Sequence, residues 1–219
     1  MNSFHTRIAL LVQTSSEWSR QVLEGVGEYA SSIGGWEFHI EPRGFYEKLS
    51  LPLNWEGDGV ICRLTDPELI EELHSRNIPA VNVSWKELKS SHIPNVISDE
   101  VACGEMAAGY FMQNGWTNFG FVGPPPDLKY SNLTEKTYLQ SLAVHGYSAH
   151  RFEHTPGYDK LSLEEQRSGM EKWLRSLPKP VALFVWTTTM GQEIMLFCRR
   201  LGLSVPNDVA ILAVELDPL

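Results

Sequence analysis

The chain has 219 residues, with 18 Lys and Arg against 27 Asp and Glu, which gives a formal net charge of −9. Hydrophobic residues make up 42% and aromatic residues 11%, enough for a buried core, so the composition excludes a disordered chain. The acidic balance argues against non-specific binding to phosphates, which needs basic surface. A sensor or an enzyme therefore fits better than a nucleic-acid-binding domain.

Cysteine usage and the N-terminal sequence both predict a cytoplasmic protein. Cys62, Cys103 and Cys198 are odd in number and far apart, which is typical of reduced thiols rather than of a disulfide framework. The apolar run at 8–12 is too short for the core of a signal peptide or for a membrane span. We therefore expect neither export nor a membrane partner.

The first half of the chain alternates short apolar runs with helical patterns. A helix at 16–33 is predicted from a possible serine cap and its apolar spacing, and a second begins at Asp66-Pro67, a cap followed by proline. A third is predicted from Asp99 to Met112. The predicted strands lie at 8–12, 36–40, 58–62, 80–83 and 95–97.

The same alternation restarts after Gly115. The predicted helices lie at 131–145, 163–177 and 190–201, and the predicted strands at 118–122, 148–152, 181–185 and 209–214. Strands separated by helices of about 10–15 residues indicate βαβ units and a parallel sheet. The predicted fold class is therefore α/β, with two doubly wound parallel-sheet lobes at 1–115 and 116–219.

Motifs for catalysis and metal binding are mostly absent from the sequence. It contains no Walker A loop, no G-x-S-x-G and no H-E-x-x-H. The histidines His145, His150 and His154 straddle a predicted turn and strand, and no Cys or carboxylate is placed as an obvious further ligand. We therefore expect no catalytic residues, no metal and no cofactor.

The candidate binding residues follow from geometry, because ligands of open α/β sheets bind beyond the carboxyl ends of the strands. Hydroxyls, carboxylates, arginines and indoles follow those strands, and such groups can hydrogen-bond a polyol or stack on it. The candidates are Ser15, Ser16, Trp18, Arg20, Arg63, Ser84, Trp85, Asp99, Tyr130, Trp186, Thr187, Thr188 and Glu215, with Gln13 beside the first of them.

Each candidate also has a purely structural interpretation. Trp18 can pack against the start of its helix, and Arg63 can be a surface charge. Asp99 and the pair Thr187-Thr188 can cap helices, which is compatible with a ligand contact for Asp99. Trp186 can belong to the core of its lobe.

Several segments resemble a known family of sensor domains. The stretch at 203–215 resembles the "VP-x-DVA-V-x-G-x-D" signature of lactose/galactose-repressor-type sensors, and 96–123 resembles their central segment. The stretch at 20–29, RQVLEGVGEY, is similar to the first helix of xylose operon regulators, and 173–180 is similar to the same subgroup. In that subgroup the sensor precedes an AraC-type DNA-binding domain.

The resemblance implies a periplasmic-binding-protein-like type I fold in a cytoplasmic transcription regulator. Such a protein would sense a small molecule, here a pentose-like sugar, in the cleft between its lobes. It would bind operator DNA through a domain absent from this chain, as a homodimer. The resemblance also implies further strands and helices after Leu219, so we expect a C-terminally truncated sensor.

Two other functions remain open from the sequence. A transport-type sugar-binding protein shares the fold but requires export. An enzyme acting on a sugar is also compatible with doubly wound sheets, because fold alone does not determine function.

Overall fold

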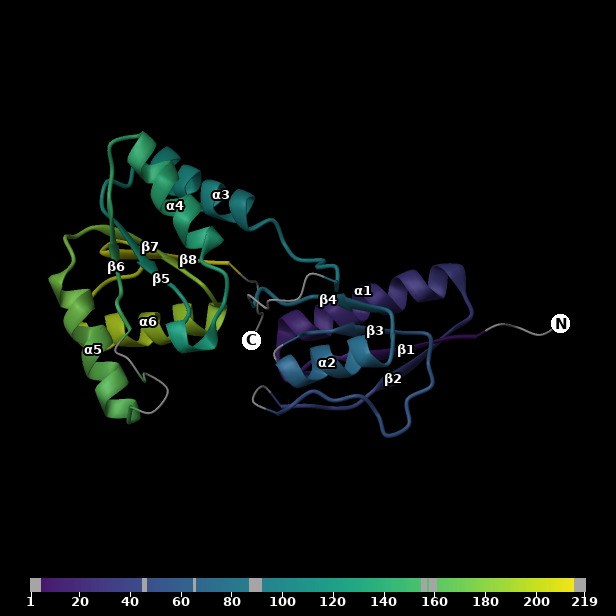
Figure 1. Ribbon diagram of the computed structural model, residues 1–219. Coiled ribbons are helices and arrows are strands. Elements are labelled where there is room, and N and C mark those ends of the chain that lie inside the picture. The colour runs from purple at the N-terminus through teal and green to yellow at the C-terminus, as the bar shows by residue number, and fades with distance from the viewer. Residues whose placement is uncertain are drawn as a thin grey trace. The chain divides into compact units, whose positions relative to one another are not determined.

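The computed structural model describes residues 5–44, 47–64, 66–86, 92–154, 157 and 161–214 (Figure 1). They form two compact units, one running up to Ser98 and the other starting at Asp99. Each unit contains a four-stranded parallel sheet flanked by helices. The predicted α/β class with two parallel sheets is confirmed.

The sheet of the first unit has the strand order β2-β1-β3-β4. Its strands are β1 (Thr6–Leu11), β2 (Trp36–Ile40), β3 (Gly59–Cys62) and β4 (Ala80–Asn82). Cys62 at the end of β3 pairs with Leu11 at the end of β1, so these strands finish at one edge. The strand predicted at 95–97 is only a single bridge, between Asn95 and Asn82.

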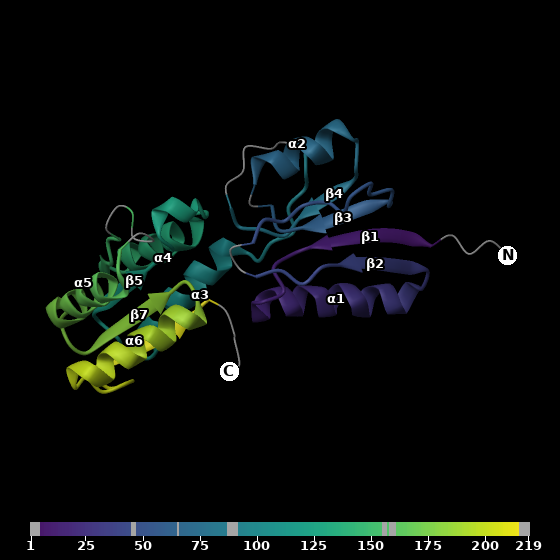
Figure 2. The same ribbon diagram turned by 90° about the horizontal axis from the view of Figure 1, so that it is seen from below.

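Helices α1 (Glu17–Ile33) and α2 (Pro67–Ser75) cover opposite faces of this sheet (Figure 2). The side chain of Asp66 caps α2 by accepting a hydrogen bond from the backbone N–H of Glu68, and Pro67 occupies the first turn, as predicted. On the α2 face, Leu69 and Leu73 pack against Val60 and Cys62. The apolar face of a short helix thus covers the centre of the sheet.

The sheet of the second unit has the order β6-β5-β7-β8, again with parallel neighbours. Its strands are β5 (Phe119–Val122), β6 (Ala149–Arg151), β7 (Val181–Val185) and β8 (Val209–Ala213). Every residue of β7 is buried, as a central parallel strand covered on both faces requires.

Four helices flank this second sheet, two on each face (Figure 1). One face is covered by α3 (Glu100–Gln113) and α4 (Leu133–Val144), the other by α5 (Leu163–Ser176) and α6 (Thr188–Leu201). A short 3-10 helix, η1 (Pro126–Leu128), follows β5.

Helix α3 belongs to the second unit, whereas the boundary predicted near residue 115 put it in the first. The reason is packing, because Ala107, Ala108 and Phe111 are buried with Tyr138 and Leu142 of α4. The repeating pattern of strands and helices, from which the domain boundary was predicted, carries no information on such contacts.

Within the described residues, no helix is both long and apolar enough to cross a membrane.

The three cysteines are free thiols. Burial raises the pKa of the Cys62 thiol to about 12, so this thiol stays protonated and unreactive near neutral pH.

Candidate functional site

In each unit, the residues that follow the parallel strands lie at one edge of the sheet, the carboxyl edge. In the first unit these residues follow β1, β3 and β4, and in the second they follow β5, β7 and β8. This edge is where ligands of open α/β sheets bind.

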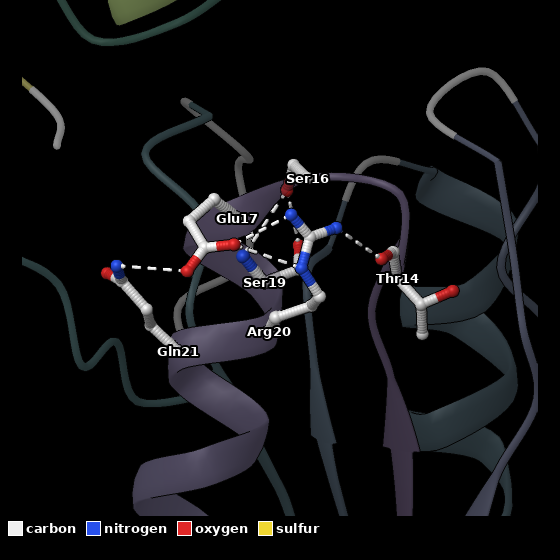
Figure 3. A network of polar contacts seen from close by, with 6 residues as sticks. All are labelled: Thr14, Ser16, Glu17, Ser19, Arg20 and Gln21. Carbon is white, nitrogen blue, oxygen red and sulfur yellow. Dashed lines mark hydrogen bonds and ion pairs between the residues drawn. The ribbon is translucent and has the colours of Figure 1, made fainter. Parts of the chain in front are cut away.

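The turn from β1 into α1 carries a polar network (Figure 3). Ser16 caps α1, since its Oγ accepts a hydrogen bond of 3.3 Å from the backbone N–H of Ser19. Arg20 is exposed, and its Nε and Nη2 donate to Oε2 of Glu17 at 3.0 and 2.7 Å. Its Nη1 donates to the carbonyl oxygen of Thr14 at 3.3 Å. These three hydrogen bonds hold the guanidinium of Arg20 at the start of α1.

Arg63, which follows β3, lies beside this turn. Its Nη1 donates to Oε1 of Gln13 over 3.2 Å. Its guanidinium carbon lies 5.5 Å from the centroid of the Trp18 ring, within the range of a cation–π contact. Gln13 is only 3% exposed, so a buried amide and an indole both hold this arginine.

The end of β4 is organised around Asn82, a buried polar residue in an apolar strand. Its Oδ1 accepts from the backbone N–H groups of Leu64 and Ser84 at 2.9 and 3.0 Å. Ser84 is 3% exposed, and its Oγ accepts from the backbone N–H of Lys86. The candidate Ser84 therefore stabilises the loop after β4, a role that the sequence did not indicate.

An apolar groove of about 550 Å³ lies on the first unit, along α1 and the sheet. Two candidates, Trp18 and Trp85, help to line it. The other lining residues are Gln21, Val22, Gly25, Val26, Tyr29, Trp36, Ile61, Val81, Val83, Val96, Ile97 and Ser98. Trp85 thus lies among apolar side chains, whereas Ser15 is exposed on the turn before α1.

At the carboxyl edge of the second unit, indole and hydroxyl groups predominate. Thr187 caps α6 by accepting a hydrogen bond of 3.1 Å from the backbone N–H of Met190, and Thr188 is the first residue of the helix. The ring of Trp186 lies 5.4 Å from that of Tyr130. The indole Nε1 of Trp186 is buried and has no hydrogen-bond partner among the described residues.

Two acidic candidates remain. Asp99 caps α3, with Oδ1 accepting from the backbone N–H of Ala102 at 2.9 Å, as predicted. Its carboxylate, together with that of Glu100, adds to the effect of burial in raising the pKa of Cys103. Glu215 lies outside the described residues.

The structure brings Trp18 and Arg63 together in the first unit and Tyr130 and Trp186 together in the second. The structural interpretations of Ser16, Asp99 and Thr187 as helix caps are confirmed. Sequence reasoning missed Glu17 as the ion-pair partner of Arg20. Their spacing of three residues on one helix was the available signal.

Comparison with known proteins covers both units. Residues 108–219, slightly more than half of the chain, match the family model of the periplasmic binding protein-like domain. The chain belongs to this family. Residues 7–103 match the model of the XylR N-terminal domain. The resemblance inferred from the sequence motifs is therefore confirmed, and both family matches agree with the observed fold.

The named relatives are transcription regulators. The xylose operon regulatory protein of Haemophilus influenzae is 25% identical over 230 residues, which cover 100% of this chain and 58% of that protein. That of Escherichia coli K12 is 26% identical over 219 residues, which cover 97% and 55%. This chain thus spans little more than half the length of these relatives.

Solved structures share the fold. The structure described as xylose-binding transcription activator xylR superposes with a TM-score of 0.79 at 25% identity, over 97% of this chain and 55% of that one. A LacI-family transcriptional regulatory protein from Corynebacterium glutamicum has a TM-score of 0.67 at 17% identity. The second likeness concerns the fold alone.

Proposed function

We propose that this chain is the effector-sensing part of a transcription regulator and that its effector is a small sugar of the xylose type. The observation that carries the proposal is the likeness to a xylose-binding transcription activator over 97% of the chain, with a TM-score of 0.79. The XylR N-terminal match over residues 7–103 supports the same subgroup.

The polar groups at the two carboxyl edges have the chemistry that a sugar requires. The guanidinium groups of Arg20 and Arg63 donate hydrogen bonds, and the carboxylate of Asp99 accepts them. In the second unit, the buried Nε1 of Trp186 could donate a hydrogen bond to a ligand hydroxyl. Because Ser84 and Thr187 already bond to the backbone, we expect smaller contributions from them.

Regulation would follow if the sugar binds two conformations of the protein with different affinity, since only such a ligand shifts the equilibrium between them.

The functions of the relatives support three further proposals: a cytoplasmic location, no catalytic activity, and operator DNA as a partner bound through sequence outside residues 1–219. An operator with two half-sites is bound by two copies of a DNA-binding domain, so we propose a homodimer. Light scattering of the full-length protein tests it.

Isothermal titration calorimetry of D-xylose, other pentoses, hexoses and xylitol tests the sugar proposal. We expect saturable binding of a pentose-like sugar. Absence of heat with every sugar, both for this chain and for the full-length protein, would overturn the sugar proposal.

Trp186→Phe gives a sharper test, because it removes the Nε1 donor while the side chain remains aromatic. We expect the affinity for the sugar to fall roughly tenfold. The matched control is Trp116→Phe, since Trp116 packs beside the core formed by α3, α4 and the sheet, away from the strand ends that carry the candidates. Equal affinities of the two variants would count against a ligand contact at Trp186.

A further inference from the structure

Two stretches far apart in the sequence meet at one arginine of the first unit. Gln13 follows β1, Trp18 lies in the first turn of α1, and Arg63 follows β3. We infer that Gln13 is a positioning residue that holds the Arg63 guanidinium at the carboxyl edge, where Arg63 donates to an oxygen atom of the bound ligand. This inference rests on the proposed function.

The burial of Gln13 is the first step of the argument. The residue is 3% exposed, and its Oε1 accepts the 3.2 Å bond from Nη1 of Arg63. Leaving a buried amide oxygen without a donor costs more than the hydrogen bond itself contributes, and a bond to a charged donor is stronger than a neutral one. The buried amide therefore favours one position of the guanidinium.

Trp18 restricts the same group from a second direction. The guanidinium carbon lies over the indole, 5.5 Å from the ring centroid, and Arg prefers to stack on such a ring. Where the guanidinium covers the ring, a sugar cannot stack. On this face of its ring, Trp18 therefore contributes to recognition through Arg63, rather than by the direct stacking that the sequence suggested.

The chemistry of the ligand follows from the donor. A guanidinium carries five N–H donors in a rigid fork and no acceptor, so it can serve Gln13 and further oxygen atoms together. The group it recognises is an oxygen acceptor, which a sugar hydroxyl or the carboxylate of a sugar acid supplies. D-xylose and D-xylonate are the probes that separate these two sources.

The first experiment needs no ligand. NMR relaxation of the Arg63 Nε–H group reports how rigidly the guanidinium is held. We expect an ordered signal in the wild type and in Gln13→Glu, which keeps the shape and an acceptor oxygen. Gln13→Leu should give a mobile signal. Equal order in the wild type and Gln13→Leu would overturn the inference, whether or not the protein binds a sugar.

The second experiment is a double-mutant cycle, measured by calorimetry with both probes. We expect Gln13→Leu to weaken binding roughly tenfold, and to have no further effect in an Arg63→Leu background, because Gln13 acts through Arg63. Losses that add in the double variant would overturn the inference, since a general structural effect is additive.

Two controls keep the outcomes apart. Gln140→Leu changes the same residue type at an exposed position of α4 and should leave affinity unchanged, and melting temperatures verify that each variant is folded. If the wild-type chain binds neither probe and the full-length protein binds no other sugar, the proposed function is wrong. The proposed ligand contact of Arg63 is then wrong as well. If the wild type binds and the cycle is additive, only the inference fails.

Discussion

We propose that Asp99 both caps α3 and contacts the ligand, and these two roles can be tested separately. Its Oδ1 accepts from the backbone N–H of Ala102, and the side chain is exposed. Asparagine caps a helix about as well as aspartate but carries no charge. A pair of substitutions therefore tests the cap and the ligand contact independently.

We predict that Asp99→Ala lowers the free energy of unfolding by about 1 kcal/mol, because α3 loses its cap. Asp99→Asn should retain the stability and lose affinity for the sugar, because a neutral amide accepts more weakly than a carboxylate. Urea unfolding and calorimetry on the same samples measure both. Full affinity in Asp99→Asn would show that this carboxylate serves the helix alone.

His154 gives a prediction on pH. Its Nε2 lies 2.9 Å from the carbonyl oxygen of Gly123, and burial lowers its pKa from the ordinary value of 6.5. The unfolded chain then binds a proton more readily than the folded one. The free energy of unfolding should therefore fall as the pH drops through about 6.5 toward the lowered pKa of the folded state.

Urea unfolding at several pH values between 7.5 and 5 measures this effect. The comparison is with His154→Gln, which removes the titrating group and should show a shallower decrease in stability. The same dependence on pH in the wild type and the variant would contradict the prediction.

Some contacts of single residues could be predicted from the sequence, and others could not. The caps Ser16, Asp66 and Asp99 were predictable, because each precedes its own helix and contacts it. The contact of Arg63 with Gln13 and Trp18 joins residues about fifty positions apart. No local pattern encodes such a contact, so the sequence provided the candidates and not their grouping.

At the scale of elements, the packing of α3 on α4 depends on Gly104. A Cβ at this position would lie 2.6 Å from the carbonyl oxygen of Thr134 and 2.8 Å from the backbone nitrogen of Tyr138. Both are backbone atoms and cannot move aside without shifting the helix. The two helices approach this closely only because glycine has no side chain.

We predict that Gly104→Ala destabilises the protein by about 1–3 kcal/mol through overpacking. Gly109→Ala is the matched control in the same helix, since nothing lies within 4 Å of its added Cβ, and it should stabilise by roughly 0.5–1 kcal/mol. Thermal and urea unfolding measure both changes. A stabilising Gly104→Ala would contradict this account of the α3–α4 contact.

Helices and strands were largely predictable from the sequence, because apolar periodicity and capping residues are local signals. The strand β2 at Trp36–Ile40 agrees with the prediction at both ends. The predicted strand at 95–97 failed because only Asn95 pairs with the sheet. The prediction that α3 belongs to the first unit differs from the structure, because its place in the second unit depends on packing against α4.

At the scale of the whole molecule, the net charge of −9 gives a prediction about DNA. We expect residues 1–219 alone not to retard duplex DNA in a gel-shift assay at about 150 mM salt, because an acidic surface repels phosphates. The full-length protein should bind its operator. Operator binding by this chain alone would contradict the proposal that other parts of the protein contact DNA.

We propose that residues at the carboxyl edge of a sheet bind a sugar, and amide NMR during a titration with D-xylose tests this proposal most directly. We predict saturable shifts concentrated in the turn from Thr14 to Arg20, at Arg63, at Asp99 and from Trp186 to Thr188. Residues at the opposite ends of the strands, such as Arg7 and Val181, should shift little. Saturable binding with shifts confined to those opposite ends would contradict the account.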